Sequence, residues 1–260
     1  MHLERRALVA PDGTRLSVLD SGGDGRPVVI LHGLAGSAAE FEPTARALPE
    51  HRVVLLDARG HGRSERHPSD VSRAAFVADV AALLDEVGPA VLVGQSMGAH
   101  TAMLVAAAHP QLVDRLVLLE TAEGGDADES VADWFRSWPP AFADPRAARA
   151  FLGTGALADA WIADLEEVPD GLRPRFDPEV MARIVETLAA PRWTEWESVV
   201  APTLLVYGEH GMFAPELRDA FASRGREVRR VDLPGASHDA HLDAPECWIA
   251  AMREFAEGPA

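Results

Sequence analysis

A serine stands at the centre of the segment Gly94-Gln95-Ser96-Met97-Gly98. An apolar run, 90–93, precedes it, and a helix-forming stretch, 100–106, follows it. This order predicts a strand, a sharp turn and a helix, with the serine hydroxyl lifted clear of the backbone at the turn. Glycines flank the serine because a side chain at either place would crowd the adjoining strand or helix. Ser96 is therefore the candidate nucleophile.

A serine hydroxyl is a weak nucleophile at neutral pH and needs a neighbouring base. His238 is the best candidate for that base, because it follows the last predicted strand and precedes the final helix. This position places it at the carboxyl edge of the sheet, where Ser96 also lies and where open α/β sheets hold their sites. The nearby His241 is expected to have a supporting or structural role.

Acyl transfer also needs N–H donors that are already fixed around the developing oxyanion. One is predicted to be the backbone N–H of Met97, the residue directly after the nucleophile. The other is expected from the glycine-rich loop 32–36, in which we choose Leu34. His32 is expected to support this loop and to take no part in the chemistry.

Apolar segments of strand length alternate with longer helical patterns, which predicts a mostly parallel sheet with helices on both faces. Continuous apolar runs, such as 117–119, are typical of strands that are buried on both sides. Strands are expected at Arg6–Ala10, Arg15–Ser21, Pro27–Leu31, Arg52–Asp57, Ala90–Val93, Arg115–Glu120, Thr203–Tyr207 and Glu227–Leu233. Helices are expected near Ala38–Leu48, Val71–Val87, Pro215–Ser223 and Ala244–Ala256, and from the turn at Ser96 to His109.

Residues 121–200 interrupt this alternation, because no strong strand pattern occurs there and helical pieces are separated by prolines. The segment holds five of the six tryptophans, which are Trp134, Trp138, Trp161, Trp193 and Trp196. We interpret it as a helical cap inserted into a core made of residues 1–120 and 201–260. Most of its tryptophans are expected to form the interior of the cap, and Trp134 and Trp138 are candidates for contact with a substrate.

Four segments together resemble the α/β-hydrolase family over essentially the whole chain: His32-Gly33, 57–64 (DARGHGRS), 94–98 (GQSMG), and 235–238 (GASH) with Pro245-Glu246 after it. The combination is specific for the fold and says little about the substrate. The resemblance implies an eight-stranded sheet whose second strand is antiparallel, with a cap after strand six. It also implies Ser–His–acid catalysis with no metal or organic cofactor.

The third member of that triad is where the chain departs from the family pattern. The acid usually follows strand seven, but glycine, Gly211, occupies the expected place. Some members carry the acid at the end of strand six, where this chain has Glu120, and certain haloalkane dehalogenases and lactone-cleaving hydrolases use a glutamate there. Glu120 is our choice, since it can reach the far nitrogen of His238 and hold its tautomer. Glu209, or no functional acid, remains the alternative.

The composition restricts the class of protein. The net charge of −17 disfavours binding to nucleic acid or to an anionic membrane surface. All 24 basic residues are arginine, so Schiff-base chemistry on a lysine is excluded. A single cysteine, Cys247, permits no internal disulfide. The sequence has no signal-peptide pattern and no apolar run long enough to span a bilayer, so a cytoplasmic location is expected. The sequence does not determine the oligomeric state, and a homodimer is one possibility.

The expected function is hydrolysis of a carboxylic ester, lactone or thioester of an uncharged, apolar small molecule through an acyl-enzyme. A serine nucleophile argues against dehalogenase and epoxide-hydrolase chemistry, for which the family uses an aspartate. Carbon–carbon bond hydrolases and perhydrolases share the fold and triad, so they remain alternatives. A slow-turnover ligand receptor or signalling module is an alternative of another class.

Overall fold

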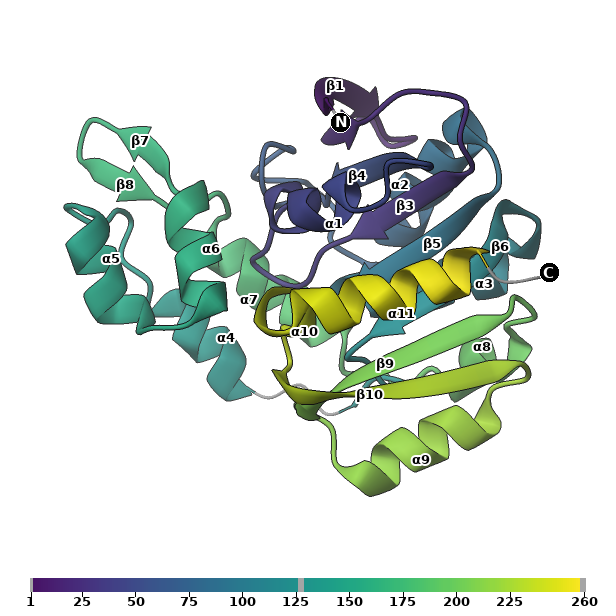
Figure 1. Cartoon of the computed structure of the whole chain (residues 1–260). Helices are drawn as coiled ribbons and strands as arrows, with labels where there is room; N and C mark the ends of the chain where they lie inside the picture. Colours follow the sequence, from purple (N-terminus) through teal and green to yellow (C-terminus); the bar gives the residue numbers. More distant parts are fainter. Residues whose placement is uncertain (1, 126–128, 258–260) are drawn as a thin grey trace.

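An eight-stranded sheet in the order β1-β2-β4-β3-β5-β6-β9-β10 forms the centre of the computed structural model, which describes residues 2–125 and 129–257 (Figure 1). The second strand is antiparallel to both of its neighbours, and the pairs from β4 to β10 are parallel. This arrangement confirms the expected sheet. The strands are β1 Glu4–Val9, β2 Arg15–Asp20, β3 Pro27–Leu31, β4 Arg52–Asp57, β5 Ala90–Gln95, β6 Val113–Leu119, β9 Thr203–His210 and β10 Val228–Ser237.

Alternate residues of the central strands enter two separate apolar cores, one on each face of the sheet. Leu92 and Leu118 belong to one core, and Val91 and Val93 to the other. The first core is covered by α2 (Arg73–Val87), α3 (Met97–Ala108), α8 (Trp193–Ser198) and α9 (Pro215–Arg224). The second is covered by η1 (Ala38–Phe41), α1 (Glu42–Arg46), α10 (Ala240–Asp243) and α11 (Pro245–Glu257). Burial on both faces is the reason that these strands are continuously apolar in sequence.

A group of smaller elements lies between β6 and β9 in the chain and stands to the left of the sheet in Figure 1. It consists of α4 (Glu129–Arg136), α5 (Pro145–Leu152), α6 (Ala156–Asp164), β7 (Glu166–Val168), β8 (Gly171–Arg173) and α7 (Pro178–Thr187). An aromatic cluster that includes Phe135, Trp138 and Phe176 packs inside it, together with Met97 of the core. The cap boundaries at 121 and 200 stay a prediction, and α8, within them, packs against α3.

The antiparallel hairpin of β7 and β8 is an element that the sequence analysis missed. Its turn is Pro169-Asp170-Gly171, and Gly171 has a φ of +128°. Proline, aspartate and glycine in this order are a strong turn signal, which was available in the sequence. The strands were overlooked because each has only three residues and none is fully buried.

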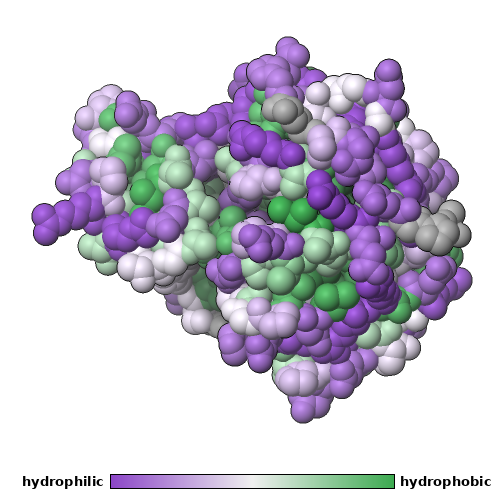
Figure 2. Space-filling model, viewed as in Figure 1, coloured by the Kyte–Doolittle hydropathy of each residue, from purple (hydrophilic) through white to green (hydrophobic). Residues whose placement is uncertain are grey.

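Hydrophilic residues cover most of the face seen in Figure 2, with smaller apolar patches among them. None of the helices in the described part of the chain is long and apolar enough to cross a membrane.

Trp196 of α8 anchors the end of the inserted segment to the core. Its side chain is fully buried and stacks on Phe221 with the ring centroids 4.3 Å apart, and its indole N–H donates to the Phe221 carbonyl at 2.8 Å. Trp134, in contrast, is 40% exposed.

We therefore expect Trp196→Ala to lower the free energy of unfolding by about 3–5 kcal/mol, because it leaves a cavity and an unpaired buried carbonyl. Trp134→Ala serves as the matched control and should lower it by clearly less. Denaturant unfolding of the two variants measures this difference. Equal losses would show that α8 is not an anchor of the core.

Candidate active site

The turn that carries Ser96 lies between the end of β5 and the start of α3. Ser96 has φ 52° and ψ −117°, a strained conformation that structures maintain at functional turns. A Cβ on Gly94 would lie 2.4 Å from the backbone of Gly98, and one on Gly98 would lie 2.4 Å from the carbonyl oxygen of Leu31. The two glycines are therefore required by close backbone approach, as the sequence analysis expected.

Glu120 follows β6 directly, and its side chain is fully buried. Its Oε2 lies 3.2 Å from Nδ1 of His238. The backbone N–H of Gly208 donates to Oε1 at 2.7 Å, and that of Met212 donates to Oε2 at 3.1 Å. These three contacts satisfy a carboxylate that has no access to water. Sequence reasoning thus placed Glu120 and His238 together, and the structure has them in hydrogen-bond contact.

Gly211 explains how the glutamate fits. A Cβ at position 211 would lie only 2.0 Å from Oε1 of Glu120, so the carboxylate fills the space that any side chain there would need. The glycine in the place of the usual aspartate and the glutamate at the end of β6 are therefore two parts of one arrangement.

Glu209, the alternative acid, lies elsewhere. It is exposed, and its Oε2 accepts a hydrogen bond from the backbone N–H of Gly235 at 2.8 Å. This contact supports the loop that leads to His238. The carboxylate that contacts the His238 ring is that of Glu120.

The loop after β3 runs directly beside the nucleophile. A Cβ on Gly33 would lie 3.4 Å from Cβ of Ser96 and 2.0 Å from Oε1 of Gln95. The ring of His32 fixes the loop, because its Nδ1 donates to the Gly33 carbonyl at 2.7 Å and its Nε2 accepts from the N–H of Ala58 at 3.0 Å. Leu34 therefore follows a residue that is packed against Ser96.

The side chain of Gln95 connects this loop to the base. Its Nε2 donates to the carbonyl of His238 at 3.3 Å and to Oδ1 of Asp239 at 3.4 Å. The residue before the nucleophile therefore holds the backbone of the candidate base. Glu120 at the end of β6 contacts His238 in the loop after β10, and Glu120 and Ser96 line the same pocket.

A pocket of about 280 Å³ opens at Ser96, Met97 and Glu120. The residues that complete its lining are His100, Thr121, Ala122, Gly124, Gly125, Val185, Leu188, Met212, Phe213 and Leu217. Sequence reasoning missed these residues. For the apolar ones no signal was available, but His100 stands four residues after Ser96, which places both on one face of α3.

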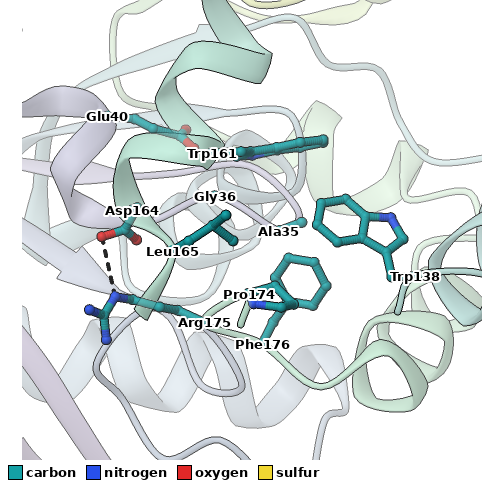
Figure 3. Close-up of a pocket in the computed structure, with 10 residues that line it drawn as sticks. All are labelled: Ala35, Gly36, Glu40, Trp138, Trp161, Asp164, Leu165, Pro174, Arg175 and Phe176. Atoms are coloured by element: carbon teal, nitrogen blue, oxygen red, sulfur yellow. Dashed lines mark ion pairs between the residues drawn. The ribbon is translucent and has the colours of Figure 1, made fainter. Parts of the chain in front are cut away.

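Trp134 and Trp138 do not line this pocket. Trp138 lines a second cavity, of about 20 Å³, beside Ala35 and Gly36 of the loop after β3 (Figure 3). Its six-membered ring faces Ala35 there, while Glu40 and Trp161 lie side by side at another edge of the cavity. Trp134 packs edge-on against Trp138, with the ring centroids 5.2 Å apart. Contact of these two side chains with a substrate stays a prediction.

Glu40 is a buried carboxyl in this second cavity. Burial raises its pKa from 4.5 to about 7, with a smaller contribution from the negative charge of Asp164, while His32 acts in the opposite direction. Nε2 of His241 lies 3.8 Å from its Oε2. The His241 ring stacks on Phe41, and burial lowers its pKa to about 4, so it is neutral at pH 7. The structural role expected for His241 agrees with these contacts.

This raised pKa predicts a pH-dependent stability. The folded state keeps a proton on Glu40 that the unfolded state releases above pH 4.5, so folding loses free energy as the pH rises from about 4.5 to 7. Glu40→Gln removes this loss and should gain on the order of 2–3 kcal/mol over the wild type between pH 5 and pH 8. Denaturant unfolding at the two pH values measures the gain. Glu50→Gln, at an exposed carboxylate, is the control. An equal gain in the free energy of unfolding in both variants would contradict the prediction.

Among residues 2–125 and 129–257, no group of three or more His, Cys, Asp or Glu side chains is arranged to hold a metal ion.

Comparisons with known proteins place this geometry in context. The chain is 28% identical over 249 residues to 2-(acetamidomethylene)succinate hydrolase of Mesorhizobium japonicum, which covers 90% of this chain and 88% of the relative. It is 29% identical over 255 residues to the sn-1-specific diacylglycerol lipase ABHD11 of Mus musculus, covering 88% of this chain and 80% of the relative.

Solved structures of other hydrolases superpose on nearly the whole chain. The crystal structure of E-2-(acetamidomethylene)succinate hydrolase superposes with a TM-score of 0.88 at 25% identity, covering 99% of this chain and 100% of the other. The enol-lactonase of Burkholderia xenovorans LB400 superposes with a TM-score of 0.80 at 25% identity, covering 96% and 99%. The model of the alpha/beta hydrolase family matches residues 28–252. The chain therefore belongs to the alpha/beta hydrolase family, whose relatives named above are hydrolases.

Proposed function

We propose that the protein is a serine hydrolase that cleaves a carboxylic ester or lactone of a small molecule through an acyl-enzyme. The observation that carries the proposal is the contact of the buried Glu120 carboxylate with the His238 ring, next to a pocket that Ser96 lines at its strained turn. A carboxylate that orients an imidazole is the arrangement that activates a serine hydroxyl within reach of the ring.

In the proposed reaction, Ser96 Oγ attacks the substrate carbonyl carbon while Nε2 of His238 takes the hydroxyl proton. The backbone N–H groups of Leu34 and Met97 hold the oxyanion. The tetrahedral intermediate then expels the alcohol, which receives the proton from His238. Water attacks the acyl-enzyme with His238 again as the base, and the free acid leaves. Glu120 keeps the proton of the neutral ring on Nδ1 and stabilises the imidazolium.

The lining of the pocket supports a substrate with a mostly apolar body. Val185, Leu188, Met212, Phe213 and Leu217 supply apolar walls, and a pocket of about 280 Å³ suits a small acyl group. The expectation of an uncharged, apolar substrate comes from the tryptophans of the cap, and the apolar walls of the pocket support its apolar part.

The relatives favour hydrolysis but do not identify the type of bond that is cleaved. Their names cover a diacylglycerol lipase, a 2-(acetamidomethylene)succinate hydrolase and an enol-lactonase. Thioesterase, carbon–carbon bond hydrolase and perhydrolase chemistry use the same triad and are the alternatives within the fold. Labelling of Ser96 by a fluorophosphonate tests for an activated serine, and turnover of a panel of chromogenic esters, lactones and thioesters then separates these three kinds of hydrolysis. Labelling without turnover of any of them would favour a carbon–carbon bond hydrolase or a ligand receptor.

The identity of the acid is tested by a pair of variants. Glu120→Gln should fold normally and lose about a thousandfold or more in kcat, because the amide favours the wrong tautomer of His238. Glu209→Gln should stay close to the wild type. Steady-state kinetics with a p-nitrophenyl ester measures both. If Glu209→Gln shows the large loss and Glu120→Gln does not, the catalytic role belongs to Glu209.

Gly211 gives a steric test of the same arrangement. Gly211→Ala should displace the carboxylate of Glu120 and lower kcat by about a hundredfold, since small misplacements of a catalytic unit are costly. Adding Glu120→Asp, which shortens the acid by one methylene, should recover part of the loss relative to Gly211→Ala alone. Thermal unfolding checks that the variants fold. Full turnover in Gly211→Ala would contradict the proposed geometry.

A further inference from the structure

His100 presents an unsatisfied imidazole to the pocket that holds Ser96. It lies one helical turn after the nucleophile, and its backbone N–H donates to the Ser96 carbonyl at 2.9 Å. The residue is 3% exposed, and within the described part of the chain neither ring nitrogen has a hydrogen-bond partner. Burial and the positive charges of Arg73 and Arg192 lower its pKa to about 3, so the ring is neutral and carries one N–H. Buried polar groups of this kind are normally satisfied, by protein, water or ligand.

Arg73 lies behind the same wall and lacks a counter-ion. It is 4% exposed, and its Nη2 donates to the carbonyl of Met97 at 3.4 Å and to Oγ1 of Thr101. Its Nε and Nη1 have no partner among the described residues, and no carboxylate of those residues lies within 4 Å of it. The guanidinium carbon lies 4.5 Å from the centre of the Phe76 ring.

Arg59 shows what this protein does with a buried arginine that is only structural. Arg59 is 1% exposed and forms ion pairs with Asp79 at 2.6 Å and with Asp12 at 2.8 Å. Arg73 has neither, and burial lowers its pKa to about 9. It also stands at the first position of α2, where the helix dipole disfavours a cation. An uncompensated buried charge costs several kcal/mol, and an anion from outside the chain would offset that cost.

The charged groups near Arg73 do not neutralise its unpaired positive charge. Arg192 contributes a further positive charge, but it is partly balanced by Glu195 at 3.0 Å. Glu120 lines the same pocket, but its carboxylate is already engaged by two N–H groups and by His238. Glu123 is not within ion-pair distance of Arg73 in the described structure, although its carbonyl accepts from Arg192 N–H at 2.7 Å.

We propose that the wall formed by His100, with Arg73 and Arg192 behind it, is a subsite for a carboxylate in the acyl part of the substrate. The inference rests on the proposed hydrolase function and replaces its uncharged substrate by one with an apolar body and an anionic end. The neutral His100 N–H donates to the carboxylate, and the two arginines supply the positive potential. The acyl carbonyl at Ser96 and the carboxylate at His100 are then held one helical turn apart on α3.

Two esters of equal chain length test the proposal: mono-p-nitrophenyl glutarate, which carries a terminal carboxylate, and p-nitrophenyl valerate, which carries a methyl group there. The measured quantity is the ratio of their kcat/KM values after the spontaneous rates are subtracted. Arg73→Met should lower this ratio by about tenfold or more, and His100→Leu should lower it also. Arg73→Lys keeps the charge and should retain most of the ratio.

Arg46→Met is the matched control, because it removes the same unit of charge from an exposed position on α1 and so changes long-range repulsion equally. It should leave the ratio unchanged. A ratio in Arg73→Met that equals the ratio in Arg46→Met would overturn the subsite. If Arg73→Met fails to fold, His100→Leu decides: a ratio equal to that of Arg46→Met would overturn the subsite.

Binding without turnover separates the subsite from the hydrolase function. Calorimetry on the Ser96→Ala protein compares monomethyl glutarate with methyl valerate, and we expect about tenfold tighter binding of the glutarate that disappears when Arg73→Met is added. Such binding without turnover of either chromogenic ester by the wild type would retain the subsite and reject the hydrolase. If the wild type turns over the valerate ester and the ratio does not depend on Arg73, the hydrolase function is retained and the subsite is rejected.

Discussion

The buried carboxylate of Glu120 is the constraint on which the candidate site depends. A charge without solvent is tolerated only where hydrogen bonds replace water, and here they come from two backbone N–H groups and from His238. Those groups lie around the end of β9 and in the loop after β10, so both strand ends must be held in register with the end of β6. The N–H of Glu120 itself donates to the Val206 carbonyl at 2.9 Å, which continues the pairing of β6 with β9.

The rest of the site is built by backbone proximity at the same edge of the sheet. Gly33, Gly94, Gly98 and Gly211 each stand where a side chain would collide with a neighbouring strand, helix or carboxylate. Ser96, the loop after β3 and Glu120 therefore all follow central parallel strands of the sheet. The apolar walls of the pocket come from outside the central strands, in particular from α7 and the residues after β9. Differences in substrate among relatives of one fold are expected in such segments.

Much of this could be predicted from the sequence, for identifiable reasons. The central strands are fully buried on both faces, so their apolar runs are unmistakable, and Ser96, Glu120 and His238 each follow such a run or its turn. The pocket walls could not be predicted, because an apolar residue such as Val185 or Leu188 in a helix has the same pattern whether it faces a core or a cavity. The interest in Trp134 and Trp138 came from residue type alone, and in the structure both rings belong to one aromatic cluster with Phe135, Phe151 and Trp161. The missing counter-ion of Arg73 is likewise invisible in the sequence, since it depends on which residues fail to approach it.

Glu120 has a second property, a φ of +51°, and it is the last residue before the chain leaves the sheet for the inserted helices. Glu120 and the first residue of the segment between β6 and β9 therefore share a single peptide unit. The backbone N–H of Ser96 donates to the carbonyl of Leu119 at 2.9 Å, so the residue before Glu120 also holds the candidate nucleophile. A backbone shift at 119–121 would therefore displace the candidate nucleophile and the candidate acid together.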